Sequence, residues 1–182
     1  MALDRITLAT FRNHSETALY GVHNRFNLLV GENGAGKTNV LEALSLFAPG
    51  RGLRRAGLGD LPRVGTNAFA VGASLAQAEG EAVRLGTYVR ADQPTRRRVQ
   101  VNGAQASANS LGEWLAVGWL TPAMDGLFTD SAGARRRFLD RMTLALEPGH
   151  AHHTARYEAA LRERNRLLAG DDEPVKGRGL RA

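Results

Sequence analysis

The chain has 182 residues, of which 43% are hydrophobic and 23% charged, so it is long enough for one domain with a sizeable core. It has no cysteine, which excludes disulfides and thiolate metal sites, and no apolar run approaches the length of a membrane span. Its net charge of +6 suits a phosphate-bearing partner, although a composition rich in Arg, Ala and Gly also gives such a charge. The N-terminus lacks a signal-peptide layout, so we expect a cytoplasmic protein without membrane contact.

The first predicted element is a strand over residues 5–11, where apolar and polar residues alternate. A turn around residues 12–14 follows, and residues 17–20 are predicted to pair with the first strand. An apolar run over residues 26–30 then predicts a short buried strand. Residues 39–47 are predicted to form a helix, because Val40, Leu41, Leu44 and Phe47 keep helical spacing.

Between these last two elements lies the motif Gly-Glu-Asn-Gly-Ala-Gly-Lys-Thr, residues 31–38, which fits the G-x-x-x-x-G-K-[ST] pattern of phosphate-binding loops. The order of strand, glycine-rich loop and helix favours a nucleotide site over an ordinary glycine-rich turn. Glycines allow positive φ, so that backbone N–H groups can converge on a phosphate at the N-terminus of the helix.

In this motif Lys37 is predicted to reach the β- and γ-phosphates of a nucleotide, and the Thr38 hydroxyl to ligate Mg²⁺. The chain has only two lysines against 22 arginines, so a lysine at the position that the motif requires is less likely to be a chance match. The motif thus predicts a nucleotide with bound Mg²⁺. The predicted nucleotide-binding residues of the loop are Gly31, Glu32, Asn33, Gly34, Ala35, Gly36, Lys37 and Thr38.

Further along the chain, residues 49–65 are rich in Gly and Arg and predict a long loop. Alternating segments predict antiparallel strands at residues 69–75, 82–90 and 97–101, and Asn102-Gly103 is a strong hairpin signal. Helices are predicted at residues 135–146, with N-cap candidates at 129–131, and at residues 154–168. The histidines between them, His150, His152 and His153, are predicted to lie in an exposed loop.

This pattern predicts four segments. They are a P-loop lobe over residues 1–66, an antiparallel β subdomain over residues 67–109, a helical lobe over residues 110–169, and a disordered polar tail over residues 170–182.

Two runs of arginines are weaker candidates for contacts with DNA phosphates. A run in a strand points its middle member away from the other two, and a run on a helix spreads around the axis, so neither forms one patch. A solvated face with local ion pairs is the alternative for both runs. The candidates are Arg96, Arg97 and Arg98 in the first run, and Arg135, Arg136 and Arg137 in the second.

The combined pattern resembles the N-terminal part of the RecF family, bacterial DNA replication and repair proteins among the SMC-like, ABC-type ATPases. The resemblance covers about residues 3 to 168 and rests on four segments: Thr10-Phe11-Arg12-Asn13, residues 31–43, Leu120-Thr121-Pro122 and residues 136–140. It implies an α/β P-loop NTPase fold like an SMC head, without the C-terminal part of the ATPase fold. It also implies that Arg12 and Asn13 lie on the nucleotide side, whereas the alternative for Arg12 is a solvated turn residue.

The resemblance further implies an ATP-binding protein of DNA replication, repair and recombination. Such proteins bind DNA at single-strand/duplex junctions and in gapped duplexes, support recombinase loading and the SOS response, dimerise around ATP and work with recombination mediator proteins. An ABC-type ATPase also needs an Asp-Glu pair that ends an apolar strand and a signature serine loop. Neither is recognisable here, so hydrolysis stays open. The alternatives are a P-loop ATPase or kinase without a DNA role, and a non-catalytic truncated remnant.

Overall fold

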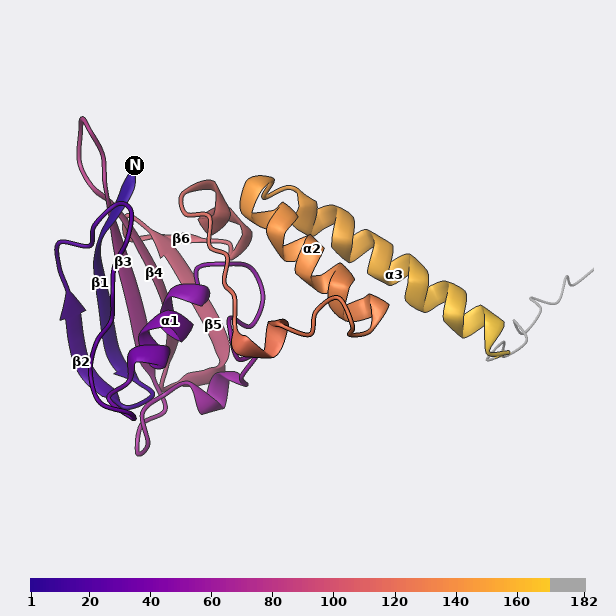
Figure 1. Cartoon of the computed structure of the whole chain (residues 1–182), viewed down its shortest axis with the longest axis horizontal. Helices are drawn as coiled ribbons and strands as arrows, with labels where there is room; N and C mark the ends of the chain where they lie inside the picture. The colour runs from indigo at the N-terminus through magenta and orange to yellow at the C-terminus, as the bar shows by residue number, and fades with distance from the viewer. Residues whose placement is uncertain (171–182) are drawn as a thin grey trace, which may run out of the picture.

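A six-stranded antiparallel sheet in the order β2-β1-β3-β4-β5-β6 forms the centre of the protein (Figure 1). The computed structural model describes residues 1–170, and the rest of the predicted tail lies outside the described residues. The strands are β1 (Ala2–Phe11), β2 (His14–Leu19), β3 (Phe69–Ala76), β4 (Val83–Arg90), β5 (Gln93–Val101) and β6 (Ala104–Ala106).

The strands predicted from alternating residues all form. Residues 17–20 were expected to pair with the first strand, and Thr17 indeed lies opposite Leu8. Asn102 and Gly103 make the β5–β6 turn with φ angles of 50° and 83°, the left-handed values that the hairpin signal requires. Strand β1 also pairs with β3, so one sheet runs across the predicted boundary between residues 66 and 67. The division into lobes stays a prediction.

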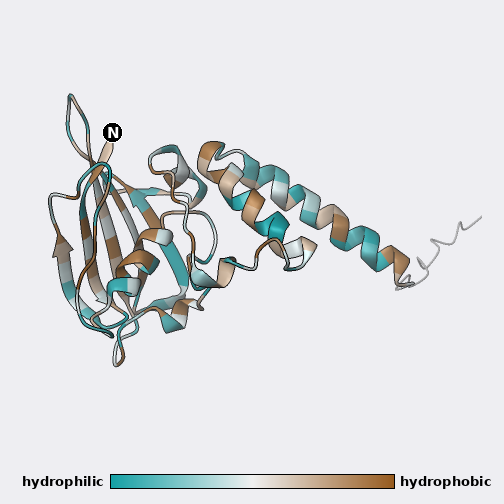
Figure 2. Cartoon of the chain, viewed as in Figure 1, coloured by the Kyte–Doolittle hydropathy of each residue, from teal (hydrophilic) through white to brown (hydrophobic). Residues whose placement is uncertain are grey.

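Helix α1 (Lys37–Ser45) covers one face of this sheet (Figure 1). Its buried residues Val40 and Ala43 share a core with Leu8 of β1 and Val71 of β3. Leu41, which was expected on the same apolar stripe, is instead 48% exposed. Figure 2 shows brown, apolar bands along the strands and on α1. Because strand residues alternate between faces, one face of the sheet packs under α1 and is buried, whereas most residues of the other face are exposed or only partly buried.

Helices α2 (Ala132–Leu146) and α3 (His150–Leu168) form a hairpin that projects from one side of the sheet (Figure 1). The predicted N-cap is confirmed at Ser131, whose Oγ accepts a hydrogen bond of 3.2 Å from the backbone N–H of Ala134. The loop predicted at the three histidines is wrong. His150, His152 and His153 lie in the first turns of α3, because the chain is already helical at Gly149, with φ −62° and ψ −21°.

Short 3₁₀ turns connect these elements, namely η1 (Leu58–Asp60), η2 (Asn109–Glu113) and η3 (Pro122–Met124). Among the described residues, no helix has both the length and the apolar character needed to cross a membrane.

The strand predicted just before the phosphate-binding loop is wrong. Residues 26–30 form no strand, and the side chains of Phe26, Leu28 and Val30 are 92%, 87% and 82% exposed. A buried strand needs neighbouring strands and a covered face. No strand of the described residues pairs with this segment, so these three side chains face solvent, and only Leu29 between them packs partly against the core.

Candidate nucleotide site

The glycine-rich loop leads directly into α1, which begins at Lys37. Gly34 and Gly36 have φ angles of 86° and 99°, in the left-handed region that glycine adopts readily. A Cβ on Gly36 would lie only 2.4 Å from Nε2 of His14, so no larger residue fits there without displacing that ring. The first N–H groups of a helix have no intrahelical acceptor, and this loop therefore ends at a site suited to an anion.

The two side chains with predicted phosphate and metal roles lie at this same helix start. The Lys37 ammonium folds back over the loop and donates to the carbonyl oxygens of Gly31 and Glu32, at 2.7 and 2.8 Å. Thr38 is exposed in the first turn of α1. A phosphate in the loop would therefore find an ammonium and a hydroxyl beside it. The residues fit a Mg²⁺-bound nucleoside triphosphate.

The turn between β1 and β2 holds the loop from the other side. The amide of Asn13 donates to the carbonyl of Gly34 at 3.0 Å and accepts from the amide of Asn39 at 2.7 Å. Nε2 of His14 lies 3.2 Å from the carbonyl oxygen of Gly36. Because a carbonyl only accepts, Nε2 carries the proton in this contact. Asn13 thus lies against the loop, and its contact fixes the shape of the loop.

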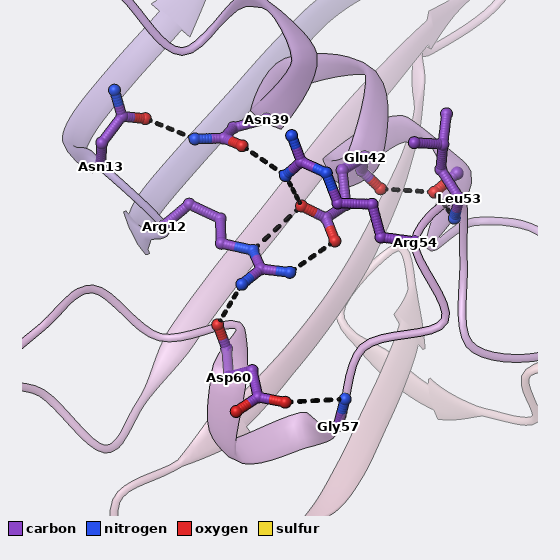
Figure 3. A network of polar contacts seen from close by, with 9 residues as sticks. Arg12, Asn13, Asn39, Glu42, Leu53, Arg54, Gly57 and Asp60 are labelled. Atoms are coloured by element: carbon purple, nitrogen blue, oxygen red, sulfur yellow. Dashed lines mark hydrogen bonds and ion pairs between the residues drawn. The ribbon is translucent and has the colours of Figure 1, made fainter. Parts of the chain in front are cut away.

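Arg12 belongs to a network of ion pairs around Glu42 (Figure 3). The Glu42 side chain is 1% exposed and accepts two hydrogen bonds from Arg12, at 2.9 and 2.7 Å, and one from Arg54 at 2.7 Å. Arg12 also donates to the carbonyl of Asp60 at 2.6 Å, and Arg54 donates to the side-chain oxygen of Asn39 at 2.7 Å. Arg12 is therefore held in place by a buried carboxylate and is not a solvated turn residue.

An open hollow of about 630 Å³ lies next to this network and to Asn13. Its lining residues are Arg12, Asn13, Asn39, Arg54, Asp60, Pro62, Arg63 and Val64. Sequence reasoning missed Asn39, Glu42 and Arg54 at this place. A carboxylate between the apolar positions Val40 and Ala43 was the available signal for Glu42, whereas Arg54 lies in a segment where arginine is common and gives no signal.

The first arginine run separates as its strand position predicts. The Arg97 side chain turns toward α1 and donates to the hydroxyl of Thr87 at 2.7 Å, to the carbonyl of Gly50 at 3.0 Å and to the carbonyl of Leu46. Burial lowers the pKa of Arg97 below its ordinary value. Arg98 donates to Gln93 at 2.8 Å, and Arg96 is exposed. Arg97 therefore supports the fold, and Arg96 is the one arginine of this run whose side chain is exposed to solvent.

The second run spreads around α2. Arg136 stacks over the ring of Tyr157 at 3.8 Å and lies 3.4 Å from the carboxylate of Asp140. Arg135 and Arg137 are exposed. The structure thus brings Asn13 against the loop at Gly34, with Arg12 next to Asn13 and bound to Glu42 of α1. It does not bring the two arginine runs together in one surface.

The comparisons with known proteins first define the class. A protein-family model described as "AAA domain, putative AbiEii toxin, Type IV TA system" matches residues 26–79. The fold matches a structure of the recombination mediator protein RecF-ATP in the RecFOR pathway, with 24% identity and a TM-score of 0.77 over 97% of this chain and 47% of that chain. It also matches a structure from work on SMC ATPases, with 20% identity and a TM-score of 0.59 over 78% of this chain and 99% of that chain. The predicted class is confirmed: the chain has the P-loop ATPase fold of SMC heads, with an antiparallel sheet and helices.

Sequence comparison narrows the class. The chain is 48% identical over 171 residues to the "DNA replication and repair protein RecF" of Rhizobium leguminosarum bv. trifolii, which covers 92% of this chain and 45% of that protein. It is 49% identical over 169 residues to RecF of Mesorhizobium japonicum, covering 91% of this chain and 44% of that protein. The chain therefore spans about half the length of the curated relatives it matches. The predicted resemblance is confirmed, and the chain is homologous to the N-terminal part of RecF.

Proposed function

We propose that this chain binds ATP at residues 31–38. The observation that carries the proposal is the loop itself, with Gly34 and Gly36 at positive φ directly before the start of α1. In the proposed complex the loop N–H groups and the Lys37 ammonium hold the β- and γ-phosphates, and the Thr38 hydroxyl ligates Mg²⁺. Lys37 leaves the carbonyl oxygens of Gly31 and Glu32 to make this contact.

Arg12 and Asn13 have separate roles in this proposal. Asn13 keeps the loop open to phosphate through its hydrogen bond to Gly34. Arg12 faces the adjacent hollow while its ion pair with Glu42 fixes its position, so it contacts the part of the nucleotide that extends beyond the loop. A negatively charged group of the nucleotide would then meet a guanidinium that is already held in position, so Arg12 loses little side-chain entropy on binding.

We further propose that the chain acts in DNA replication, repair and recombination as RecF does. Identity of 48% to a curated RecF over 92% of the chain supports this role. The finer features are part of the same proposal: binding to single-strand/duplex junctions and gapped duplexes, an ATP-dependent homodimer, recombination mediator partners, recombinase loading, the SOS response and a cytoplasmic location. Arg96, Arg135 and Arg137 are exposed candidates for contacts with the DNA backbone.

The chain offers no recognisable Asp-Glu pair at the end of an apolar strand, so we expect it to bind ATP and to hydrolyse it slowly or not at all. One rival proposal has a specific observation in its favour. The exposed Phe26, Leu28 and Val30 suit a non-catalytic remnant whose nucleotide site is incompletely supported. A broad, weakly cooperative thermal transition would favour the remnant, whereas a sharp transition together with ATP binding would favour the proposal.

A titration with a fluorescent ATP analogue, with and without Mg²⁺, tests the proposal. We expect saturable binding that weakens at least tenfold in Lys37→Ala, since a charge-assisted hydrogen bond contributes about 1.5–3 kcal/mol. Lys176→Ala removes the only other lysine and is the matched control. Thr38→Ala should abolish the gain from Mg²⁺, and Thr38→Ser should keep it. Equal affinity of Lys37→Ala and the parent chain would refute the site.

The DNA role is tested separately, by titrating fluorescein-labelled gapped duplex at several salt concentrations. Contacts with backbone phosphates predict that the logarithm of the affinity falls linearly with the logarithm of the salt concentration. A P-loop ATPase or kinase without a DNA role predicts no such binding.

A further inference from the structure

A second hollow lies away from the phosphate-binding loop, where the chain after α1 meets the α2–α3 hairpin. It measures about 430 Å³ and is bounded by residues 49–55, by the segment from Trp119 to Asp130, and by α2 and α3. None of residues 31–38 lines it, so it is separate from the candidate nucleotide site.

Arginines outnumber acidic residues in the lining of this hollow. Four arginines line it, Arg51, Arg55, Arg137 and Arg141, against the three acids Asp130, Asp140 and Glu158. Two of these acids already have partners outside the hollow. Asp140 pairs with Arg136 at 3.4 Å and contacts His150 at 3.0 Å, and Glu158 lies 3.9 Å from Arg162. The lining therefore presents more positive charge than its own carboxylates neutralise.

Arg141 is held in this lining by aromatic rings and has no carboxylate partner among residues 1–170. Its guanidinium stacks over Trp119 at 4.5 Å and over Phe138 at 5.4 Å. Its Nη2 reaches only the sulfur of Met124, at 3.9 Å, which is a weak acceptor. Burial, together with the nearby charge of Arg55, lowers the pKa of Arg141.

Two polar atoms of the lining residues are buried without a hydrogen-bond partner in the described part of the chain, Nε of Arg141 and Oγ1 of Thr154. A buried donor without an acceptor costs free energy, and native structures rarely leave one. Both atoms can donate a hydrogen bond, so the residues that line the hollow carry more donors than the surrounding side chains accept from.

We propose that this hollow binds a phosphate group, with Arg141 and Arg55 as its principal contacts. The planar guanidinium of Arg141 matches two phosphate oxygens, and the stacked rings keep it from turning away. Arg55 supplies the second charge from a backbone with φ of 55°, a conformation that few arginines adopt. The phosphate belongs either to a nucleic-acid backbone or to a small free phosphoester, since both present the same oxygens.

The indole of Trp119 provides a direct readout, because the guanidinium of Arg141 lies over it. The chain has two tryptophans, and replacing Trp114 by Phe leaves Trp119 as the single fluorophore. Titration of this Trp114→Phe chain with inorganic pyrophosphate should change the emission of Trp119 to saturation. The same titration in Trp114→Phe/Lys37→Ala should give the same affinity, because the loop at residues 31–38 takes no part.

Three arginine variants then locate the contact. Arg141→Gln and Arg55→Gly should each weaken pyrophosphate binding at least tenfold. Glycine accepts the positive φ of residue 55, so Arg55→Gly removes the guanidinium without straining the loop. It therefore keeps the test valid if Arg141→Gln fails to fold. Arg156→Gln, exposed on the neighbouring helix α3 and outside the lining, is the matched control and should bind as the parent does.

Competition by a thymidine oligonucleotide separates the two sources of phosphate. Displacement of pyrophosphate supports a nucleic-acid backbone as the occupant, and failure to displace it supports a free phosphoester. The proposal is overturned if Trp119 does not respond, if Lys37→Ala removes the response, or if both arginine variants bind with the parent affinity. Because Lys37→Ala affects only the nucleotide loop, this site and the proposed ATP site can fail independently.

Discussion

The two flanks of the phosphate-binding loop differ sharply. Downstream, α1 packs on the sheet and Phe47, just after it, is fully buried. Upstream, Phe26 is 92% exposed and residues 26–30 pair with no strand of the described chain. The two phenylalanines show that an apolar residue near the motif is buried only where other elements of the fold cover it. The candidate site is therefore fixed from its helix side and from the β1–β2 turn, whereas the segment upstream of the loop has no strand partner to hold it.

The largest expected difference in stability is between the alanine variants of these two phenylalanines. Phe47→Ala should lower the free energy of unfolding by about 3–5 kcal/mol, because it leaves a cavity in the core. Phe26→Ala should change it by less than about 0.5 kcal/mol, as surface substitutions do. Urea unfolding of both variants measures the difference. Similar losses would mean that residues 26–30 are packed in solution.

Removing the buried carboxylate should have the next largest effect. Glu42→Ala leaves the guanidinium groups of Arg12 and Arg54 without their shared partner, and we expect a loss of about 2–3 kcal/mol. This is below the usual range for a fully buried pair, because both arginines are partly exposed. Glu16→Ala, on the edge strand, is the control for loss of one exposed negative charge. An unchanged denaturation midpoint in Glu42→Ala would contradict the role given to this ion pair.

Replacing each of two loop glycines by alanine distinguishes the cost of backbone strain from the cost of a steric clash. Gly34→Ala adds a methyl group in open space, so it should cost about 1 kcal/mol from its positive φ alone. Gly36→Ala also drives a methyl group against His14 and Asn13, so we expect about 2 kcal/mol and a greater loss of affinity for the ATP analogue. Addition of His14→Ala should recover part of the loss in Gly36→Ala and none in Gly34→Ala. Equal behaviour of the two glycine variants would disprove the contact between the loop and the β1–β2 turn.

The smallest effect concerns the far end of α1. Arg97→Met removes a cation that caps the carbonyl groups of Leu46 and Gly50, and should cost about 1 kcal/mol. The cost stays modest because burial of the charged guanidinium is itself unfavourable, as the lowered pKa of Arg97 indicates. Arg96→Met, one residue away and exposed, should stay within about 0.5 kcal/mol. Thermal unfolding of the pair decides whether Arg97 supports the fold.

Much of the fold was predictable from local patterns. Alternation predicted β1, β3, β4 and the second half of β5, and Asn102-Gly103 predicted the turn after β5, because each of these signals is contained in a short stretch of sequence. The short strand β6 was not predicted. The strand at residues 26–30 was mispredicted because burial of an apolar run depends on neighbouring strands that its own sequence does not reveal. The first turns of α3 were missed because a Pro-Gly pair normally signals a longer break than the chain makes here.

The candidate site was predictable only in part. The motif predicted residues 31–38 and the start of α1 beside them, since each residue type has a defined place in the pattern. Glu42 and Arg54 were missed because their importance comes from a contact across 12 residues, in which an arginine from an irregular loop meets a buried carboxylate. Arg12 was assigned to the nucleotide side from resemblance, and the ion pair that holds it became visible only in three dimensions.

The pairing of β1 with β3 also has a consequence for the order of folding. Strands β3 to β6 are joined by short turns, whereas β1 meets β3 only after the chain has closed a loop of some sixty residues, as between Ala9 and Ala70. Closing such a loop costs more entropy than forming a hairpin, so we expect the β3–β6 meander to form first and β1 to join it later. The segment that carries residues 31–38 lies inside this late loop. The nucleotide site is therefore completed near the end of folding, and an early refolding intermediate should contain a sheet but bind no nucleotide.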